Sequence, residues 1–193
     1  MSAEVKEDRR VRKTKRALRE GLAELLTEKD IQNITVRELT DKVDIHRSTF
    51  YANFTDIYDL YSQIEDAVVQ EISDIFSETC TFNPQDLFKI LFQYISDNRQ
   101  VCRMFLGKNV SPTFFNRLTA LCKEACLACW CEEFGIAVIP EELEYCVHYH
   151  LSGCLAIVGK WAEGNFEYPA EQLVGIFADI DASFGVFVKS KFV

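Results

Sequence analysis

Glycine and proline are scarce in this chain, which has only 8 glycines and 4 prolines among 193 residues. Strand-rich folds need frequent tight turns, so this scarcity argues against a β-sandwich or β-barrel. No apolar run reaches the roughly 18 residues that a membrane-spanning helix requires. The N-terminal segment MSAEVKEDRR is charged and lacks the apolar core of a secretory signal. We therefore expect an all-α cytoplasmic protein with reduced cysteines and no membrane association.

The sequence also lacks the short motifs that mark common classes of enzyme. It contains no glycine-rich phosphate loop, no nucleophile elbow and no HExxH pair. The 30 acidic residues are scattered over expected helix surfaces, so no general acid and base stand out as a pair. These absences predict a protein that is not an enzyme and uses no cofactor.

Basic residues are fewer than acidic ones in the whole chain, but they are concentrated near the N-terminus. The formal net charge is −9, yet residues 1–60 contain 12 basic and 12 acidic side chains, so the whole excess of negative charge lies in residues 61–193. Seven basic residues with no acid among them occur between residues 9 and 19: Arg9, Arg10, Arg12, Lys13, Lys15, Arg16 and Arg19. A local basic surface attracts phosphates even on an acidic molecule. Charge runs on helices are often only solvated faces, and that alternative stays open here.

Apolar periodicity predicts about nine helices and no convincing strand. The expected helices span residues 9–28, 35–43, 46–53, 57–80, 84–97, 99–107, 112–134, 141–163 and 170–190. Two regions are expected, a three-helix head over residues 1–56 and a helical body over residues 57–193. Because no low-complexity linker separates the regions, the head is expected to pack directly against the body.

The head has the pattern of a helix-turn-helix. Thr35, followed three residues later by Glu38, predicts a capped short helix, and Asp44 suits a tight turn after it. A second short helix then begins near His46 and carries small polar residues at its N-terminal end, as a helix that enters a major groove needs. Phe50 would anchor the opposite side of this helix to the core. The alternative is a three-helix unit that binds protein rather than DNA.

The segment ITVRELTDKVDIHRSTFYANFTDIYDLY resembles the head of the TetR family of bacterial repressors, over about residues 10–60. The resemblance implies contacts with operator DNA from the second and third helices. Together with the pattern above, it gives the expected DNA-binding residues Thr35, Arg37, His46, Arg47, Ser48, Thr49 and Tyr51. His46 is alternatively a solvent-facing helix cap. The family's aromatic signature TFYxxF is present here at residues 49–54. A lysine common in the family just after this signature is absent, and Ile57 stands near its place; Lys42, Arg47 or the basic run are candidates to compensate.

The last two expected helices suggest a dimer. Apolar residues near the C-terminus are spaced 4, 3, 4, 3, which is typical of a coiled-coil seam. In the TetR family two such helices from each subunit form a four-helix interface, and a twofold protein matches two half-sites on DNA. The expected interface residues are Leu143, Val147, Cys154, Phe177, Ile180 and Phe184. The alternative is that these apolar faces complete a monomeric core.

An aromatic-rich segment lies between the head and these two helices. Its composition suits a pocket for a small apolar or amphipathic effector, although ordinary core packing is the alternative for each residue. The expected pocket residues are Phe76, Phe92, Phe105, Phe115 and Cys122. The sequence thus predicts a DNA-binding transcriptional regulator, a repressor controlled by a small molecule. The alternative is an activator or co-regulator that acts through a protein partner.

The cysteines and histidines of the body have three possible roles: ordinary packing, metal binding and redox sensing. Cys122, Cys126 and Cys129 share one face of their expected helix, and His148 and His150 follow on the next. Thiols and imidazoles can bind zinc or copper, and an accessible thiolate can respond to oxidants. No repeated CxxC pair is present, so ordinary packing is favoured and no metal site is expected. His150 is expected to be a core or interface residue.

Overall fold

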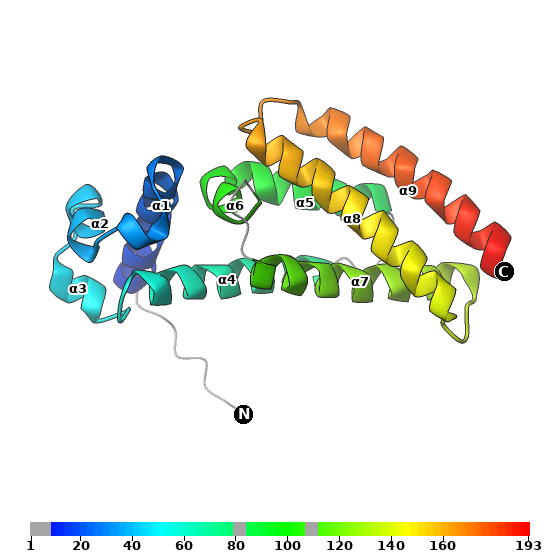
Figure 1. Cartoon of the computed structure of the whole chain (residues 1–193), viewed down its shortest axis with the longest axis horizontal. Coiled ribbons are helices and arrows are strands. Elements are labelled where there is room, and N and C mark those ends of the chain that lie inside the picture. The colour runs from blue at the N-terminus through cyan, green and yellow to red at the C-terminus, as the bar shows by residue number, and fades with distance from the viewer. Residues whose placement is uncertain (1–8, 79–83, 107–111) are drawn as a thin grey trace. The chain divides into compact units, whose positions relative to one another are not determined.

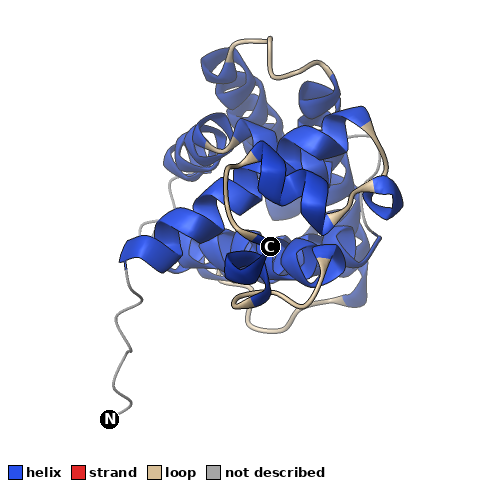
Figure 2. Cartoon of the chain, turned by 90° about the vertical axis from the view of Figure 1, so that its left-hand side faces the viewer, coloured by secondary structure: helices blue, strands red, loops and turns tan. Residues whose placement is uncertain are grey.

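The structure is a computed structural model that describes residues 9–78, 84–106 and 112–193. In these ranges the chain forms nine α-helices and one short 3-10 helix, and contains no strand (Figure 2). This confirms the predicted all-α fold and its helix count. The chain divides into two compact units, Met1–Ala67 and Val68–Val193, and the division falls inside α4 (Ile57–Glu78). Cys80, expected near the end of this helix, lies outside the described residues.

The first unit contains α1 (Arg9–Glu28), the 3-10 helix η1 (Ile31–Asn33), α2 (Val36–Lys42), α3 (Arg47–Tyr51) and the beginning of α4. Its core forms because each helix presents apolar residues at helical spacing to a shared centre. Its large apolar buried residues are Leu18, Leu22, Leu25, Ile34, Leu39, Phe50, Phe54, Ile57, Leu60 and Ile64. Phe50 and Phe54, one turn apart, pack with ring centroids 5.6 Å from each other.

Two local features set the path of the chain between α2 and α3. The Thr35 hydroxyl oxygen accepts a 3.2 Å hydrogen bond from the backbone N–H of Glu38, which confirms the predicted N-cap. The Glu38 carboxylate in turn accepts a hydrogen bond from the backbone of Thr35, as the predicted capping box requires, and it also forms an ion pair with Lys29. The hydrogen bonds from Lys29 and from the Thr35 backbone lower the pKa of Glu38. At Asp44 the backbone adopts φ 53°, the left-handed turn geometry that the sequence predicts there.

Gly21 permits the close approach of α1 to α2. A Cβ atom at this position would lie 2.3 Å from Cγ1 of Val43 and 3.2 Å from Cδ1 of Leu39. Val43 is β-branched and has little rotameric freedom to move aside. We therefore expect Gly21→Ala to destabilise the head by about 1–3 kcal/mol, as overpacking does in other cores. Thermal unfolding would measure this. Gly185→Ala, where an added Cβ would lie at an ordinary contact distance of 3.5 Å from the Phe134 ring, is the matched control, and equal stability of both variants would contradict the prediction.

The second unit contains the end of α4 and the helices α5 (Pro84–Asp97), α6 (Arg99–Leu106), α7 (Pro112–Phe134), α8 (Glu141–Glu163) and α9 (Ala170–Phe192). Helices α8 and α9 form an antiparallel pair; α5 packs along α9, and α6 and α7 pack along α8 (Figure 1). Two apolar clusters hold these helices together. One centres on Phe92, Trp161 and Phe177, and the other on Trp130, Leu143 and Val147.

The turn between α8 and α9 is fixed by an aromatic residue in an unusual conformation. Asn165 and Phe166 have backbone φ angles of 56° and 57°, which residues other than glycine rarely adopt. Phe166 is nevertheless buried, and its ring packs edge-on against Trp161 at 4.9 Å. The Trp161 indole N–H donates a 2.8 Å hydrogen bond to the Tyr168 carbonyl. These contacts hold the two long helices at a defined separation.

Candidate functional site

Helix α3 presents one polar face and one apolar face. Phe50 on its inner side is fully buried, whereas Tyr51 is 59% exposed. His46, Arg47 and Ser48 are also exposed, and Thr49 is half-buried. The structure therefore brings together five of the predicted DNA-binding residues, four on α3 itself and His46 at the position just before it. His46 occupies the N-cap position without a side-chain capping bond, which leaves its imidazole at the surface.

The two predicted contacts before α3 lie at the start of α2. Thr35 and Arg37 are both exposed, and the guanidinium of Arg37 lies 3.6 Å from the Asp41 carboxylate one turn later. An exposed pair of this kind contributes little to stability and separates easily when a phosphate competes for the arginine. Lys42, a candidate to replace the family's missing lysine, forms a 2.8 Å ion pair with Glu24 of α1, and this hydrogen bond raises the pKa of Lys42.

The start of α4 is capped by two carboxylates. Asp56 accepts a 2.8 Å hydrogen bond from the backbone N–H of Asp59, and Asp59 accepts one of 2.7 Å from the backbone N–H of Thr55. The bonds from the Thr55 backbone and the Gln63 amide lower the pKa of Asp59. Ile57, near the place where the family often has lysine, is buried in the head core. This cap was not predicted from the sequence, although the TDIYD spacing of acids in the first turn was a usable signal.

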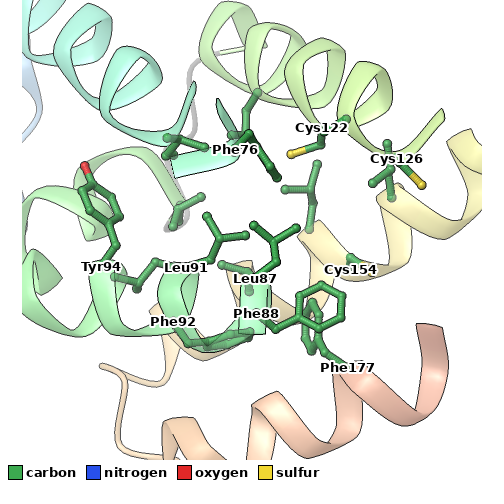
Figure 3. A pocket seen from close by; sticks show the side chains of 18 of the residues that line it. Phe76, Leu87, Phe88, Leu91, Phe92, Tyr94, Cys122, Cys126, Cys154 and Phe177 are labelled. Atoms are coloured by element: carbon green, nitrogen blue, oxygen red, sulfur yellow. The ribbon is translucent and has the colours of Figure 1, made fainter. Parts of the chain in front are cut away.

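The body encloses an apolar cavity of about 170 Å³. It is lined by residues of every body helix, and Figure 3 shows Tyr94 on one side with Cys122 and Cys126 across from it. Four of the five predicted pocket residues line this cavity: Phe76, Phe92, Phe105 and Cys122. Burial raises the pKa of the Cys122 thiol to about 12. The cavity surroundings therefore have the low polarity expected of a binding site for an apolar ligand.

Phe115, the fifth predicted pocket residue, does not line the cavity. It is 39% exposed on the outer side of α7, and its neighbour Phe114 is buried at the cavity wall instead. The helical period explains the correction: Phe114, Leu118 and Cys122 lie four residues apart and share the inner face of α7. Phe114 also stacks on Phe105 with ring centroids 4.8 Å apart.

A buried charged pair interrupts the apolar wall. Nε2 of His150 in α8 lies 3.3 Å from Oδ1 of Asp181 in α9, and the side chains are only 4% and 15% exposed. Cys154, one turn along α8, brings its sulfur to 3.9 Å from the same nitrogen. Burial alone would lower the pKa of His150, but the hydrogen bonds with Asp181 and Cys154 outweigh it and raise the pKa to about 9. His150 is therefore protonated at neutral pH.

The cysteines of the body do not assemble a metal site in the part of the chain that the structure describes. No group of three or more His, Cys, Asp or Glu side chains there has metal-binding geometry. Cys102, Cys122, Cys126 and Cys154 line the cavity. The side chain of Cys129 lies outside what is described. Packing against apolar neighbours accounts for the described cysteines without a ligand.

The residues predicted to form a dimer interface mostly face the interior of the protomer. Leu143, Val147 and Phe177 are buried in the two apolar clusters, and Cys154 lines the cavity. Phe184 is half-buried, with its ring stacked on His150 at 4.6 Å. Of the six residues, only Ile180 lies at the surface, with 39% exposure. The strongest apolar seam is thus used within the chain, because it packs α8 and α9 onto the rest of the body.

A second apolar face covers the outside of α8 and α9. Its exposed members are Tyr145, Tyr149, Ile176, Ile180 and Phe187. They recur at intervals of four or seven residues on each helix and so share one side. Gly153 and Gly175 lie in the same helices, and an added Cβ at either would meet no atom within 4 Å. We call this set the outer face of α8 and α9.

None of the helices in the described residues combines the length and apolar character needed to cross a membrane.

Comparison with known proteins identifies the class of fold and family. Residues 82–180 match the family model described as the transcriptional regulator C-terminal region of the TetR group. None of the curated proteins is significantly similar in sequence. Among solved structures, a TetR transcriptional regulator from Streptococcus agalactiae 2603V superposes with a TM-score of 0.61 at 20% identity, over 90% of this chain and 96% of that one.

Two further solved structures have the same fold. The dihydroxyacetone kinase operon activator DhaS gives a TM-score of 0.63 at 16% identity, with 90% of this chain and 97% of that chain covered. The fatty acid degradation regulator FadR from Bacillus halodurans gives 0.67 at 12% identity, with 86% and 93% covered. At these identities the likeness concerns the arrangement of helices and not the ligand or the target.

Proposed function

Since the chain belongs to the TetR family of transcriptional regulators, a class of non-enzymatic proteins, we propose that it is a repressor that binds operator DNA as a dimer and responds to a small-molecule effector. The observation that carries the proposal is the two-sided character of α3. Phe50 fixes the helix to the core, while Arg47, Ser48 and Tyr51 point outward. A short helix that is anchored on one side and polar on the other is suited to a major groove.

The exposed residues have complementary chemistry for DNA. The Arg47 guanidinium can donate two parallel hydrogen bonds to guanine or to a phosphate, and the hydroxyls of Ser48 and Thr49 suit either bases or phosphates. Tyr51 can contact a phosphate through its hydroxyl or a thymine methyl through its ring. Arg37 at the start of α2 would hold the backbone on the flank. These contacts are proposals, made on exposure and position.

Selection of bound sequences from random duplex DNA, followed by affinity measurement on the selected operator, tests this function. We expect Arg47→Ala and Tyr51→Ala each to weaken operator binding about 5-fold to 150-fold, the effect of removing one good base or charged contact. The head should remain folded, because both side chains are exposed.

Thr27→Ala is the control, since Thr27 is an exposed residue near the end of α1 whose hydroxyl bonds only to the Glu24 carbonyl. It should bind the operator like the parent protein. Absence of any sequence preference in the parent protein at low salt would reject the proposed function, as would full affinity in both α3 variants.

The outer face of α8 and α9 is proposed as the dimer interface. Tyr149 is 76% exposed and Ile180 39% exposed, in a row of apolar side chains that has no covering element in the described chain. Mid-helix glycine costs about 1 kcal/mol relative to alanine. Gly153 and Gly175 have no close neighbour within the protomer, and close approach of a partner helix would give both a role. Two heads joined in this way would match two half-sites one helical turn apart.

The effector part of the proposal rests on the cavity and on α4. Val68, Ile72 and Phe76, in the last three turns of α4, line the cavity, and the same helix begins at Ile57 in the head. A ligand that prefers one position of these last turns would shift the population of head positions in the dimer. A coupling of about 1–3 kcal/mol is enough to change operator affinity 5-fold to 150-fold.

Activation is the second candidate, because one protein of similar structure is an operon activator. The charge pattern of the present chain offers one argument for activation. Lys42 is engaged in an ion pair with Glu24, and the position near which the family often has lysine is held by the buried Ile57, so few phosphate contacts are available near these two positions. A reporter gene placed behind the selected operator distinguishes the two functions. Loss of the regulator should raise expression for a repressor and lower it for an activator.

A further inference from the structure

We propose that the cavity binds an uncharged, ring-sized molecule with a hydroxyl group, a phenol or alicyclic alcohol, whose hydroxyl meets the buried pair of Asp181 and His150. This inference names the chemical class of the effector and takes its regulatory meaning from the proposed function. The binding itself is a property of the body and is tested without DNA.

The size of the cavity sets the first limit. At about 170 Å³ it is slightly larger than an engineered protein cavity of about 150 Å³ that stays dry and binds benzene. A six-membered ring with one or two substituent atoms fills such a space. The walls next to the space are chiefly phenyl and branched aliphatic groups, among them Phe88, Phe92 and Leu91 (Figure 3).

The charges of the wall set the second limit. Among the described residues that line the cavity, His150 and Asp181 are the only charged ones, and they form a pair with no net charge. A ligand carboxylate would place a second negative charge near Asp181, and a ligand ammonium would stand beside the His150 imidazolium. Burying an uncompensated charge in such a site costs several kcal/mol. The pair therefore selects against both kinds of ion.

The carboxylate of Asp181 supplies the specific contact. A carboxylate has about four lone-pair sites, and the hydrogen bond with His150 uses one of them. A ligand hydroxyl can donate a hydrogen bond to the second carboxylate oxygen. A hydrogen bond to a charged group is among the stronger contacts that an uncharged ligand can make. Tyr94 carries the one hydroxyl among the described residues of the wall. It donates a 2.6 Å hydrogen bond to Glu71, so its proton is already engaged.

Isothermal titration calorimetry on the full chain with three probes of one ring size tests the proposal. Phenol has the hydroxyl, toluene replaces it with a methyl group, and benzoate replaces it with a charge. We expect phenol to bind about tenfold or more tightly than toluene, the contribution of a hydrogen bond to a charged group, and benzoate not to bind. Toluene binding as tight as phenol, preference for benzoate, or no binding by any of the three overturns the inference.

Asp181→Leu keeps the branched shape of the side chain, at a larger volume, and removes the acceptor. We expect it to lower the ratio of phenol affinity to toluene affinity to near one. Toluene binding in this variant shows that the cavity is still formed, so a folding defect cannot imitate the result. Asp179→Asn, an exposed carboxylate two residues earlier on α9, should keep the ratio of the parent protein. An unchanged ratio in Asp181→Leu, or a loss in Asp179→Asn, contradicts the assignment of the acceptor.

Repeating the operator titration with saturating phenol separates this inference from the proposed function. A change in operator affinity supports both. Selective phenol binding with unchanged operator affinity keeps the ligand class and rejects effector control by this class. Operator binding without any phenol binding leaves the DNA-binding function intact and rejects the inference.

Discussion

Asp181→Asn is expected to cost about 3 kcal/mol of stability at pH 6 and almost none at pH 10. Asp181 and His150 are a buried pair, with side chains 15% and 4% exposed. The hydrogen bonds with Asp181 and Cys154 raise the pKa of His150 to about 9 against the opposing effect of burial. Without the carboxylate the imidazole would lose its proton inside the fold, and the variant would lack the stabilisation that the ion pair provides at low pH.

The direction of the pH dependence follows from the sign of this shift. The folded pKa of His150, about 9, lies above the unfolded value of 6.5. The stabilisation is therefore complete below about pH 6.5 and is lost as the pH rises through about 9. The free energy of unfolding of the parent protein should fall over this range, whereas Asp181→Asn should lack this component. The other titratable groups around the imidazole are the thiols of Cys122, Cys126 and Cys154.

Urea unfolding at pH 6.5, 8 and 9.5 measures the effect, with Asp179→Asn as the control for loss of a carboxylate from α9. Asp179 is exposed, so its variant should keep the full pH slope of the parent protein. An Asp181→Asn variant with the parent's slope would mean that another group, such as a cavity thiol, causes the pH dependence.

Local sequence signals predicted the head well because the interactions involved are local. The Thr35 cap joins residues three apart, and Asp44 in its left-handed conformation needs only its own backbone. Phe50 and Phe54 share a helix face by spacing alone. What spacing could not show is the ion pair that Glu38 also forms with Lys29, which lies nine residues away across a turn.

The C-terminal helices show the limit of periodicity. Helix α9 has an apolar row at Leu173 and Phe177 and another at Ile176 and Ile180. Each row has helical spacing, so the pattern alone cannot decide which row faces the protomer and which faces outward. The seam taken from the sequence as a dimer interface is largely buried inside the chain, because α5 packs along α9 and completes that side.

The charged pair in the cavity was not predicted for a similar reason. His150 and Asp181 are 31 positions apart and meet only when α8 and α9 fold back on each other. The sequence did contain one usable signal, since Asp181 follows Phe177 by one turn and so extends the buried face of α9. A carboxylate in such a row must find a partner or a ligand.

Charge introduced on the outer face of α8 and α9 is expected to produce a monomer that binds the operator at least about 100-fold more weakly. The double variant Tyr149→Arg and Ile180→Arg places two like charges per protomer on the proposed interface. In a twofold dimer each charge would meet its own copies across the interface, and desolvation of these charges would oppose association. Operator affinity falls because the second head would no longer be held near its half-site by the first.

Light scattering at several protein concentrations measures the mass, and titration of the selected operator measures affinity. The protomer should stay folded, because both side chains are exposed, at 76% and 39%. Val138→Arg is the control: Val138 is an apolar residue 81% exposed between α7 and α8 and is not one of the residues that define the outer face. If the double variant remained dimeric, the dimer interface would have to lie on another surface. A monomer with full operator affinity would instead show that one head suffices, against the requirement for two matched half-sites.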